Sequence, residues 1–434
     1  MHQLEIKLIQ HTPIIHFQHN QYGATLRASE VKPKLDKYIF KNLSPSQKDE
    51  GLKNGWIKTN NNRNWLNYKM IIISSNQTDE YLFTSDISNK EESAIRSADI
   101  NVINDSPFFA QREVDKTIKT KDEWDKISKK GLFQTNLTIK ILVCSDTLKS
   151  LLMMHIPPFF VIHNFGNRQD KGFGSYLSKS ISIDGSVVCQ NEPNKDEIKE
   201  ILKAEFSFVF KKELTIENND NRFVAIFQTI KDDYQKLKSG KSTTNSELYK
   251  FLREGDSDGT MRMEDQYFKA EIERLLRQRN NNYSIEKKEV SNNNLNNNLN
   301  YIYARALLGL AEQFEYGLYL RNNTNSDGIR KKAEDATIVV KVLKSNDLQR
   351  FQSPLCFKVI NNILYIVGNS VPQEICGKNI QFEYSLKRNN DSSLTQLGEG
   401  SLNTPSNFNL MNFMDQAMAS LGYTKIKPIN NKHK

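Results

Sequence analysis

Cysteine is scarce in this sequence, and no apolar run is long enough to span a membrane. The four cysteines lie far apart and form no C-x-x-C pair: Cys144, Cys189, Cys356 and Cys376. This spacing argues against a zinc ribbon or a disulfide framework and favours a reducing cytoplasm. The longest apolar stretch, Leu151 to Ile162, is interrupted by one histidine and two prolines, and the N-terminus lacks an apolar signal core. We therefore expect a cytoplasmic protein without a membrane partner.

The sequence also lacks the signatures of several enzyme classes and metal sites. It contains no H-E-x-x-H, G-x-S-x-G or EF-hand motif and no paired-carboxylate signature. His16 and His19 could begin a metal site, but two histidines three residues apart in a polar segment are usually surface residues. We expect neither a metal nor a cofactor.

The charge balance is basic. The chain has 60 Lys and Arg against 51 Asp and Glu, a net charge of +9, with 38% hydrophobic and 10% aromatic residues. This composition is typical of a globular protein, and 434 residues leave room for two to three domains. A positive excess suits an anionic partner such as nucleic acid, although a solvated basic surface explains it equally well.

Glycines and cations gather in one short stretch, residues 165–175, which we call the glycine loop. Its notable residues are three glycines, two cations and two phenylalanines: Phe165, Gly166, Arg168, Lys171, Gly172, Phe173 and Gly174. Glycine lets a backbone approach a ligand closely, and Phe173 adds a flat apolar face. The loop lies between the apolar run 159–162, interpreted as a strand, and a further strand at 181–183. This order is expected where backbone amides and cations meet a phosphate backbone, and an ordinary charged β-turn is the alternative.

The N-terminal part of the chain predicts alternating strands and helices. Strands are expected at 4–8, 69–73, 137–143 and 181–188, the last with a hairpin turn at Asp184-Gly185. Helices are expected from Ser29, interpreted as an N-cap, and over 146–154, whereas 41–66 looks irregular. Strand, helix, strand, strand, helix, strand is the ferredoxin-like or RRM-like order.

The remainder divides into a helical middle and a β-rich end. Helical spacing covers 196–214, 223–237, 246–253 and 263–279, followed by an asparagine-rich linker at 280–300 and a helix over 301–314. Strands return at 338–342, 355–360, 363–367 and 380–384, before a final helix at 407–421. We predict an α+β fold of two ferredoxin-like (RRM-like) halves with a helical middle segment, divided at 1–195, 196–330 and 331–434.

Cations and aromatic residues recur together where the backbone should turn. The cations are Arg27, Lys32, Lys34, Arg168, Lys171, residues 330–332 and Arg350, and the aromatic residues are Phe17, Tyr22, Phe165, Phe173 and Phe351. Phosphate-binding cations beside flat rings are typical of single-stranded RNA binding, although phenylalanine more often lies in a core. RNA cleavage is a further hypothesis, with His16 or His19 as the base and Arg27 or Lys32 beside the phosphate. Passive RNA binding by these side chains is the alternative.

Three motifs in this order resemble the RAMP superfamily of CRISPR effector proteins, and most closely the first subunit of the type III-B Cmr complex. They are Thr12-Pro13-Ile14-Ile15-His16 after the first strand, the run Leu26–Leu35 with its R-x-S-x-x-K pattern, and the glycine loop. A fourth, Arg350-Phe351-Gln352-Ser353-Pro354-Leu355, is similar to a run in the C-terminal half of such subunits. The helical middle and the asparagine-rich linker match nothing specific.

The resemblance implies a subunit that grips guide RNA and the guide–target duplex by their backbones, for antiviral defence. Its partners would be guide RNA, target RNA, other RAMP subunits and a large signalling subunit. The RNA contacts it implies, with Lys34 added as a neighbouring cation, are Arg27, Ser29, Lys32, Lys34, Gly166, Arg168, Lys171, Gly172, Phe173 and Gly174. Slicing members carry an aspartate in the loop before the helix, and His16 to Gly23 contains none, so we expect a structural role. A guide-processing endoribonuclease and a protein-binding RRM-like domain remain as alternatives.

Overall fold

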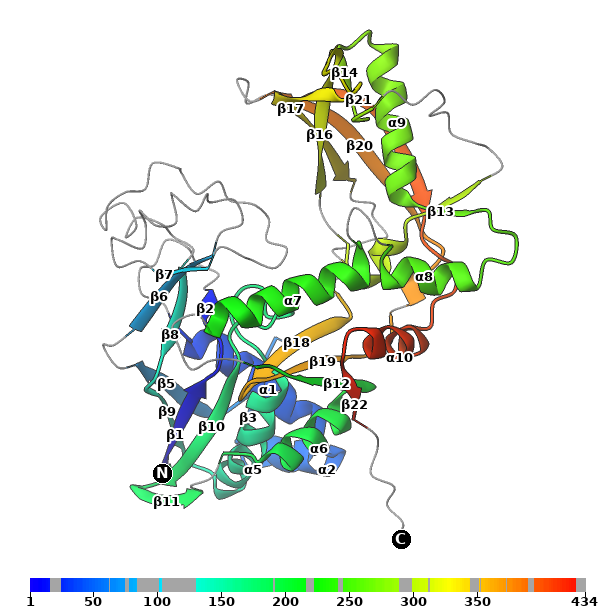
Figure 1. Cartoon of the computed structure of the whole chain (residues 1–434). Helices are drawn as coiled ribbons and strands as arrows, with labels where there is room; N and C mark the ends of the chain where they lie inside the picture. Colours follow the sequence, from blue (N-terminus) through cyan, green and yellow to red (C-terminus); the bar gives the residue numbers. More distant parts are fainter. Residues whose placement is uncertain are drawn as a thin grey trace. The chain divides into compact units, whose positions relative to one another are not determined.

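The computed structural model describes most of the chain, and its described residues form two compact units (Figure 1). The described ranges are 1–15, 25–61, 63–74, 78–83, 101–103, 130–189, 192–215, 222–240, 245–288, 299–310, 313–343, 351, 353–371, 373–388 and 394–426. Unit 1 comprises Met1–Tyr234, Leu355–Gly368 and Met418–Lys434, and unit 2 comprises Gln235–Pro354 and Asn369–Ala417. The units therefore differ from the predicted division at 195 and 330. His16, His19 and Arg350 lie outside the described residues.

The first sheet of unit 1 has five strands in the order β11-β10-β1-β9-β5, and all neighbouring pairs are antiparallel. The strands are β1 (His2–Gln10), β5 (Tyr68–Ser74), β9 (Leu137–Val143), β10 (Tyr176–Ile183) and β11 (Ser186–Cys189). Helices α1 (Ala28–Asn42) and α5 (Asp146–Ile162) pack against this sheet. Alternate side chains of β1 and β9 are buried beneath them, which is why these strands show period-two apolar patterning. The hairpin turn at Asp184-Gly185 is confirmed, since both residues have positive φ.

Helix α5 corrects two expectations. It continues to Ile162, so the glycine loop follows a helix and the run 159–162 is not a strand. Pro157 and Pro158 lie inside this helix, and Phe159 and Phe160 are fully buried in the core. Burial of this apolar segment against the sheet outweighs the local cost of the prolines.

A second sheet of unit 1 is assembled from distant segments, in the order β18-β19-β12-β22 with all pairs antiparallel. Its strands are β12 (Phe208–Glu213), β18 (Leu355–Ile360), β19 (Ile363–Gly368) and β22 (Thr424–Lys425). Helix α6 (Lys195–Glu205) precedes β12, α7 (Arg222–Lys238) follows it, and α10 (Leu410–Ser420) precedes β22. The predicted helix over 196–214 is therefore wrong after Glu205, because 208–213 pairs with β19.

Two smaller sheets complete unit 1. One has the order β2-β8-β6-β7, and its strands are β2 (Ile14–Ile15), β6 (Thr78–Phe83), β7 (Asn101–Ile103) and β8 (Lys130–Gln134). The other is the hairpin β3 (Ile57–Asn60) and β4 (Arg63–Leu66), which follows α2 (Pro45–Lys53). The expectation of an irregular segment at 41–66 is wrong. Ser44 and Gln47 form a capping box with Pro45 at the first helical position, a start signal that is readable from sequence.

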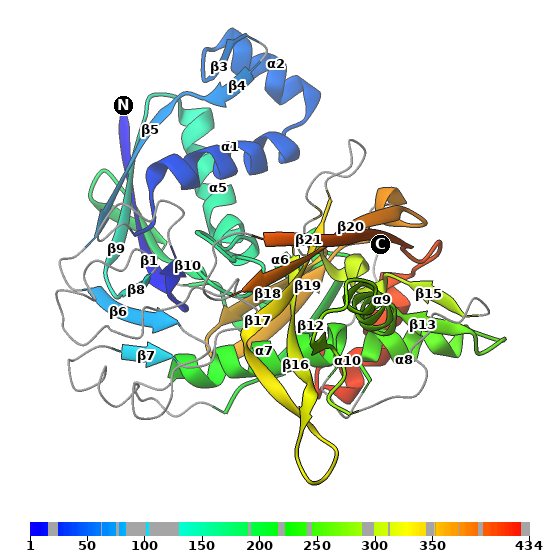
Figure 2. The same ribbon diagram turned by 90° about the horizontal axis from the view of Figure 1, so that it is seen from above.

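Unit 2 is a seven-stranded sheet in the order β13-β15-β21-β20-β17-β16-β14, packed against α9 (Glu264–Gln278) (Figure 2). Its other elements are α8 (Glu247–Glu254), β13 (Met261–Met263), β14 (Tyr283–Ser284), β15 (Asn300–Ile302), η1 (Ala304–Leu308), β16 (Gln313–Thr324), β17 (Arg330–Val342), η2 (Gln373–Ile375), β20 (Asn379–Arg388) and β21 (Leu394–Asn403). The predicted helix over 301–314 is wrong, because these residues form β15, η1 and the start of β16. None of the helices among the described residues has the length and apolar character needed to cross a bilayer.

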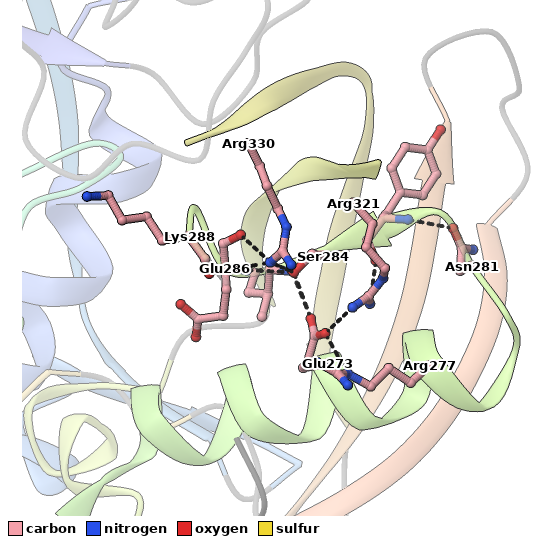
Figure 3. A network of polar contacts seen from close by, with 10 residues as sticks. Glu273, Arg277, Asn281, Ser284, Glu286, Lys288, Arg321 and Arg330 are labelled. Atoms are coloured by element: carbon pink, nitrogen blue, oxygen red, sulfur yellow. Dashed lines mark hydrogen bonds and ion pairs between the residues drawn. The ribbon is translucent and has the colours of Figure 1, made fainter. Parts of the chain in front are cut away.

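A buried carboxylate joins α9 to the neighbouring strands of unit 2 (Figure 3). Glu273 accepts hydrogen bonds from Arg321 Nη1 at 2.6 Å, Arg277 Nε at 2.9 Å and Ser284 Oγ at 3.0 Å. Burial raises the pKa of Glu273, but the hydrogen bonds from both arginines outweigh it and leave the pKa below its ordinary value. Arg330, predicted as a cation at a turn, instead donates to Ser284 Oγ at 3.1 Å and is buried.

Candidate nucleic-acid interface

The glycine loop needs its glycines for conformation and for space. Gly166, Arg168, Gly172 and Gly174 all have φ between 57° and 85°, the left-handed region that side chains disfavour. A Cβ on Gly166 would lie 2.5 Å from the carbonyl oxygen of Ile15, and one on Gly174 would overlap the backbone of Phe165. Backbone of the same chain therefore fills the space beside these two glycines.

The segment after β1 holds one side of the glycine loop. Asn167 N donates to Ile15 O at 2.6 Å, and Gly174 N donates to Pro13 O at 2.9 Å. Thr12 Oγ1 donates to Gly172 O at 2.6 Å and accepts from the N–H of Ser175 at 3.0 Å. The described part of the motif at 12–16 and the glycine loop thus form one hydrogen-bonded structure.

Helix α1 holds the loop through a carboxylate that sequence reasoning did not select. Glu30 Oε1 accepts from Gly166 N at 2.8 Å and from Lys34 Nζ at 3.0 Å. Lys34 Nζ also donates to Gln169 Oε1 at 2.9 Å and to Asn164 O at 3.3 Å, and it lies 4.9 Å from the ring centroid of Phe165. The i, i+4 spacing of Glu30 and Lys34 was a readable signal for this ion pair.

The inner side of the loop joins the second sheet. Asn164 Nδ2 donates to Phe357 O at 2.9 Å, and Phe357 N donates to Asp170 O at 3.0 Å. Ser175 Oγ donates to Val359 O at 2.6 Å. Both strand residues belong to β18, so the loop connects the first and second sheets of unit 1.

Two predicted RNA contacts point into the interior. The Phe173 ring is fully buried and stacks on Phe227 of α7, with centroids 4.1 Å apart and planes at 19°. Its position in the core is the common one for phenylalanine. Lys171 Nζ pairs with Asp170 at 2.9 Å and lies 3.8 Å from the centroid of Tyr234. Burial lowers the pKa of Lys171, but Tyr234 and Asp170 outweigh it and leave the pKa raised.

Of the remaining predicted contacts, three side chains are at least partly exposed, and Lys32 binds other residues of the protein. Ser29 is exposed, and Arg27 and Arg168 are partly exposed. Ser29 is the second residue of α1 and not its N-cap. The N-cap of α1 is Arg27, two residues before the predicted one. Burial lowers the pKa of Arg168 to about 10, with Asp170 opposing this shift. Lys32 turns away from the loop and donates to Asp36 Oδ2 at 2.8 Å and Leu66 O at 3.0 Å.

A fully buried lysine lies behind the loop. Lys358 Nζ donates to Phe160 O at 2.8 Å and to His163 O at 2.7 Å, at the C-terminal end of α5. Burial is the main cause that lowers the pKa of Lys358 to about 7. Burial likewise lowers the pKa of His163 to about 4. The carbonyl groups at a helix C-terminus are favourable partners for an ammonium group.

Family models match both parts of the chain. The model of the Cmr1 N-terminal domain matches residues 1–241, and that of the Cmr1 C-terminal domain matches residues 243–432. The chain belongs to the Cmr1 family. The resemblance stated from the three sequence motifs is thereby confirmed.

Two solved structures are similar to this Cmr1-family chain at low identity. Cmr1 from Pyrococcus furiosus in its apo form is 12% identical, with a TM-score of 0.34 over 59% of this chain and 75% of its own. A chain of the type III-B Cmr-beta complex bound to cognate target RNA is 13% identical, with a TM-score of 0.25 over 42% of this chain. The alignment covers 60% of that second chain, less than two thirds of its length. No curated protein matches this chain.

Proposed function

We propose that this chain is an RNA-binding structural subunit of a type III (Cmr-like) CRISPR interference complex, gripping guide RNA and guide–target duplex. Membership of the Cmr1 family and the basic net charge of +9 support this role. One observation carries the proposed RNA contact: Glu30 fixes the first turn of α1 against the glycine loop through Gly166. This contact brings together two motifs that are more than 130 residues apart.

The surface formed in this way suits a phosphate backbone. Ser29 places an exposed hydroxyl on the first turn of α1, where the helix dipole is positive. Arg27, the N-cap of α1, and Arg168 of the glycine loop add partly exposed cations. Such contacts read no base, so base pairing between guide and target would supply sequence choice. The glycines, Lys34, Lys171 and Phe173 would act by holding the loop in this conformation.

We further propose two ferredoxin-like halves, built around the first and the second sheet of unit 1. In chain order, the first half is β1, α1, β5, β9, α5, β10, and the second is β12, α7, β18, β19, α10, β22. Numbering the four strands of each half from one to four gives the spatial order 4-1-3-2 in both, with all pairs antiparallel. The shared order supports the predicted pair of halves. The second half takes β12 and α7 from before residue 331 and its other four elements from within 331–434.

A binding experiment tests the RNA role. Labelled repeat-containing RNA is incubated with the full chain in EDTA, alone and with other subunits of such a complex, and each gel is read for shift and cleavage. Arg27→Gln and Arg168→Gln should each weaken binding for all RNA sequences and reduce the slope of log affinity against log salt by about one. Ser29→Ala should weaken it less. Lys250→Gln, an exposed lysine of α8, is the matched control.

The outcomes separate the alternatives. A shift that weakens with salt and responds to these variants supports the proposal. Metal-independent products that disappear in His16→Ala or His19→Ala would instead support the processing nuclease. An absence of RNA binding by the chain, both alone and in the complex, would refute the RNA role.

A further inference from the structure

The hairpin β3–β4 has a fixed base. Trp56, Ile57 and Leu66 are at most 3% exposed. Leu66 N donates to Asp36 Oδ2 at 3.3 Å, and Leu66 O accepts from Lys32 Nζ at 3.0 Å, so α1 grips the hairpin backbone. Gly51 of α2 is in direct contact with the side chains of Trp56 and Ile57, leaving no room for a Cβ.

Beyond this base, the hairpin is exposed on both sides. Its exposed residues are Lys58, Thr59, Asn60, Asn61, Arg63, Asn64 and Trp65. Figure 2 shows β3 and β4 beside α2, beyond α1 and β5. A two-stranded hairpin that buries only its base gains little stability from its outer half, so the exposed outer side chains contribute little to folding.

The register gathers a tryptophan and two cations on one face. Trp65 pairs with Lys58, and Arg63 pairs with Asn60, at positions that alternate with the inward pair Ile57 and Leu66. Successive side chains of a strand point to opposite faces, so these four lie on the same face. Trp65 is 39% exposed, whereas Trp56, nine residues earlier, is 2% exposed.

We infer that the face formed by Lys58, Arg63 and Trp65 is a second RNA contact, in which Trp65 stacks on an unpaired base and the two cations bind phosphates. The segment 57–66 contains no carboxylate, so an anionic strand meets no repulsion within the hairpin. An aromatic ring beside cations is the combination that single-strand binding uses, whereas protein-binding cores gather several apolar side chains. This inference rests on the proposed RNA-binding function and adds a site that recognises single strands.

The test measures binding of the full chain to a labelled uridine 20-mer and to the same strand in a duplex. Trp65→Ala should weaken single-strand binding by about 5- to 150-fold, the range expected for one stacked base, and should affect the duplex much less. Trp65→Phe should restore most of the affinity. Lys58→Gln and Arg63→Gln should each lower the single-strand salt slope by about 0.7. Met154→Ala removes an apolar side chain of α5 that is more exposed than Trp65, and should change nothing.

Other results would overturn the inference. Wild-type single-strand affinity in Trp65→Ala, with Arg168→Gln still impaired, would refute the hairpin site and leave the proposed function standing. Equal losses on single strand and duplex would refute stacking. Loss of a protein subunit from the complex with unchanged RNA affinity would make the hairpin a protein contact. Failure of the wild-type chain to bind any RNA, alone or in complex, would refute both proposals.

Discussion

Glu30 accepts a hydrogen bond from the backbone N–H of Gly166 at 2.8 Å, and this contact joins the first turn of α1 to the glycine loop. The same oxygen accepts from Lys34, so the carboxylate charge is compensated within the protein. A carboxylate next to a proposed phosphate-binding surface would otherwise repel the ligand. The pair therefore lets an acidic residue shape a basic surface.

Loss of this carboxylate should destabilise unit 1. Glu30→Ala removes the acceptor of Gly166 N and leaves Lys34 without its ion pair, at an expected cost of about 1–3 kcal/mol. Glu30→Gln keeps an acceptor oxygen and should cost less. Denaturant unfolding measures both, with Glu200→Ala as the control, since Glu200 pairs with Lys203 at an exposed site and should contribute about 0–1 kcal/mol. Equal stability of Glu30→Ala and wild type would contradict this role.

Two glycines with similar φ should respond differently to alanine. Gly174 has φ of 63° and lies against the backbone of Phe165, whereas Gly185 has φ of 87° with open space around its Cβ position. Gly185→Ala should cost only the left-handed conformation, about 1–2 kcal/mol. Gly174→Ala adds an overlap with backbone that cannot move without breaking the loop, and should cost about 4 kcal/mol or more. Thermal unfolding compares the two, and equal losses would show that the loop relaxes.

Local patterns predicted many elements, because their signals lie within a few residues. Strand β9 was predicted at its observed bounds, and the turn at Asp184-Gly185 follows from residues that tolerate positive φ. Three predicted middle helices correspond to α7, α8 and α9 within two residues at each end. Apolar spacing at the helical period is enough to identify such segments.

Long-range pairing was not predictable in the same way. Strand β12 lies in a run with helical spacing and becomes a strand because β19 pairs with it from about 150 residues away. The predicted division at 195 and 330 therefore places β12 in a different domain from the other strands of the second sheet. At the site, the sequence identified the motifs but not the orientation of their side chains. The burial of the Phe173 ring and of the Lys171 side chain was therefore not predicted.

The buried Lys358 should make stability depend on pH. Its pKa is about 7 in the folded chain, against an ordinary 10.5, so between these values the unfolded chain binds more protons. Stability should therefore rise as pH increases from about 7 to 10.5, and this gain should be lost as pH falls back toward 7. Lys358→Met removes the titrating group, so the difference in unfolding free energy between wild type and variant should change across this window. A constant difference would contradict the prediction.

Glu273 should stabilise unit 2. Glu273→Ala leaves the partly buried guanidinium of Arg321 and the hydroxyl of Ser284 without this acceptor, and breaking a buried pair costs about 3–5 kcal/mol. Arg277→Ala is the matched control, because Arg277 binds the same carboxylate from a side chain that is 59% exposed, and it should cost about 1 kcal/mol or less. Hydrogen exchange in α9 measures both changes. Equal protection in the two variants would contradict a central role for the carboxylate.

The contacts between the glycine loop and β18 impose an order on folding during synthesis. About 180 residues separate Ser175 from Phe357, and a ribosome adding about 5–20 residues per second needs about ten to forty seconds to make them. Throughout that time the glycine loop, which leads into the first sheet, lacks its hydrogen-bond partners on β18. Strand β22, which closes the second sheet, is translated last of all the strands. A nascent chain of this protein thus presents an unsatisfied surface to chaperones until β18 has been made.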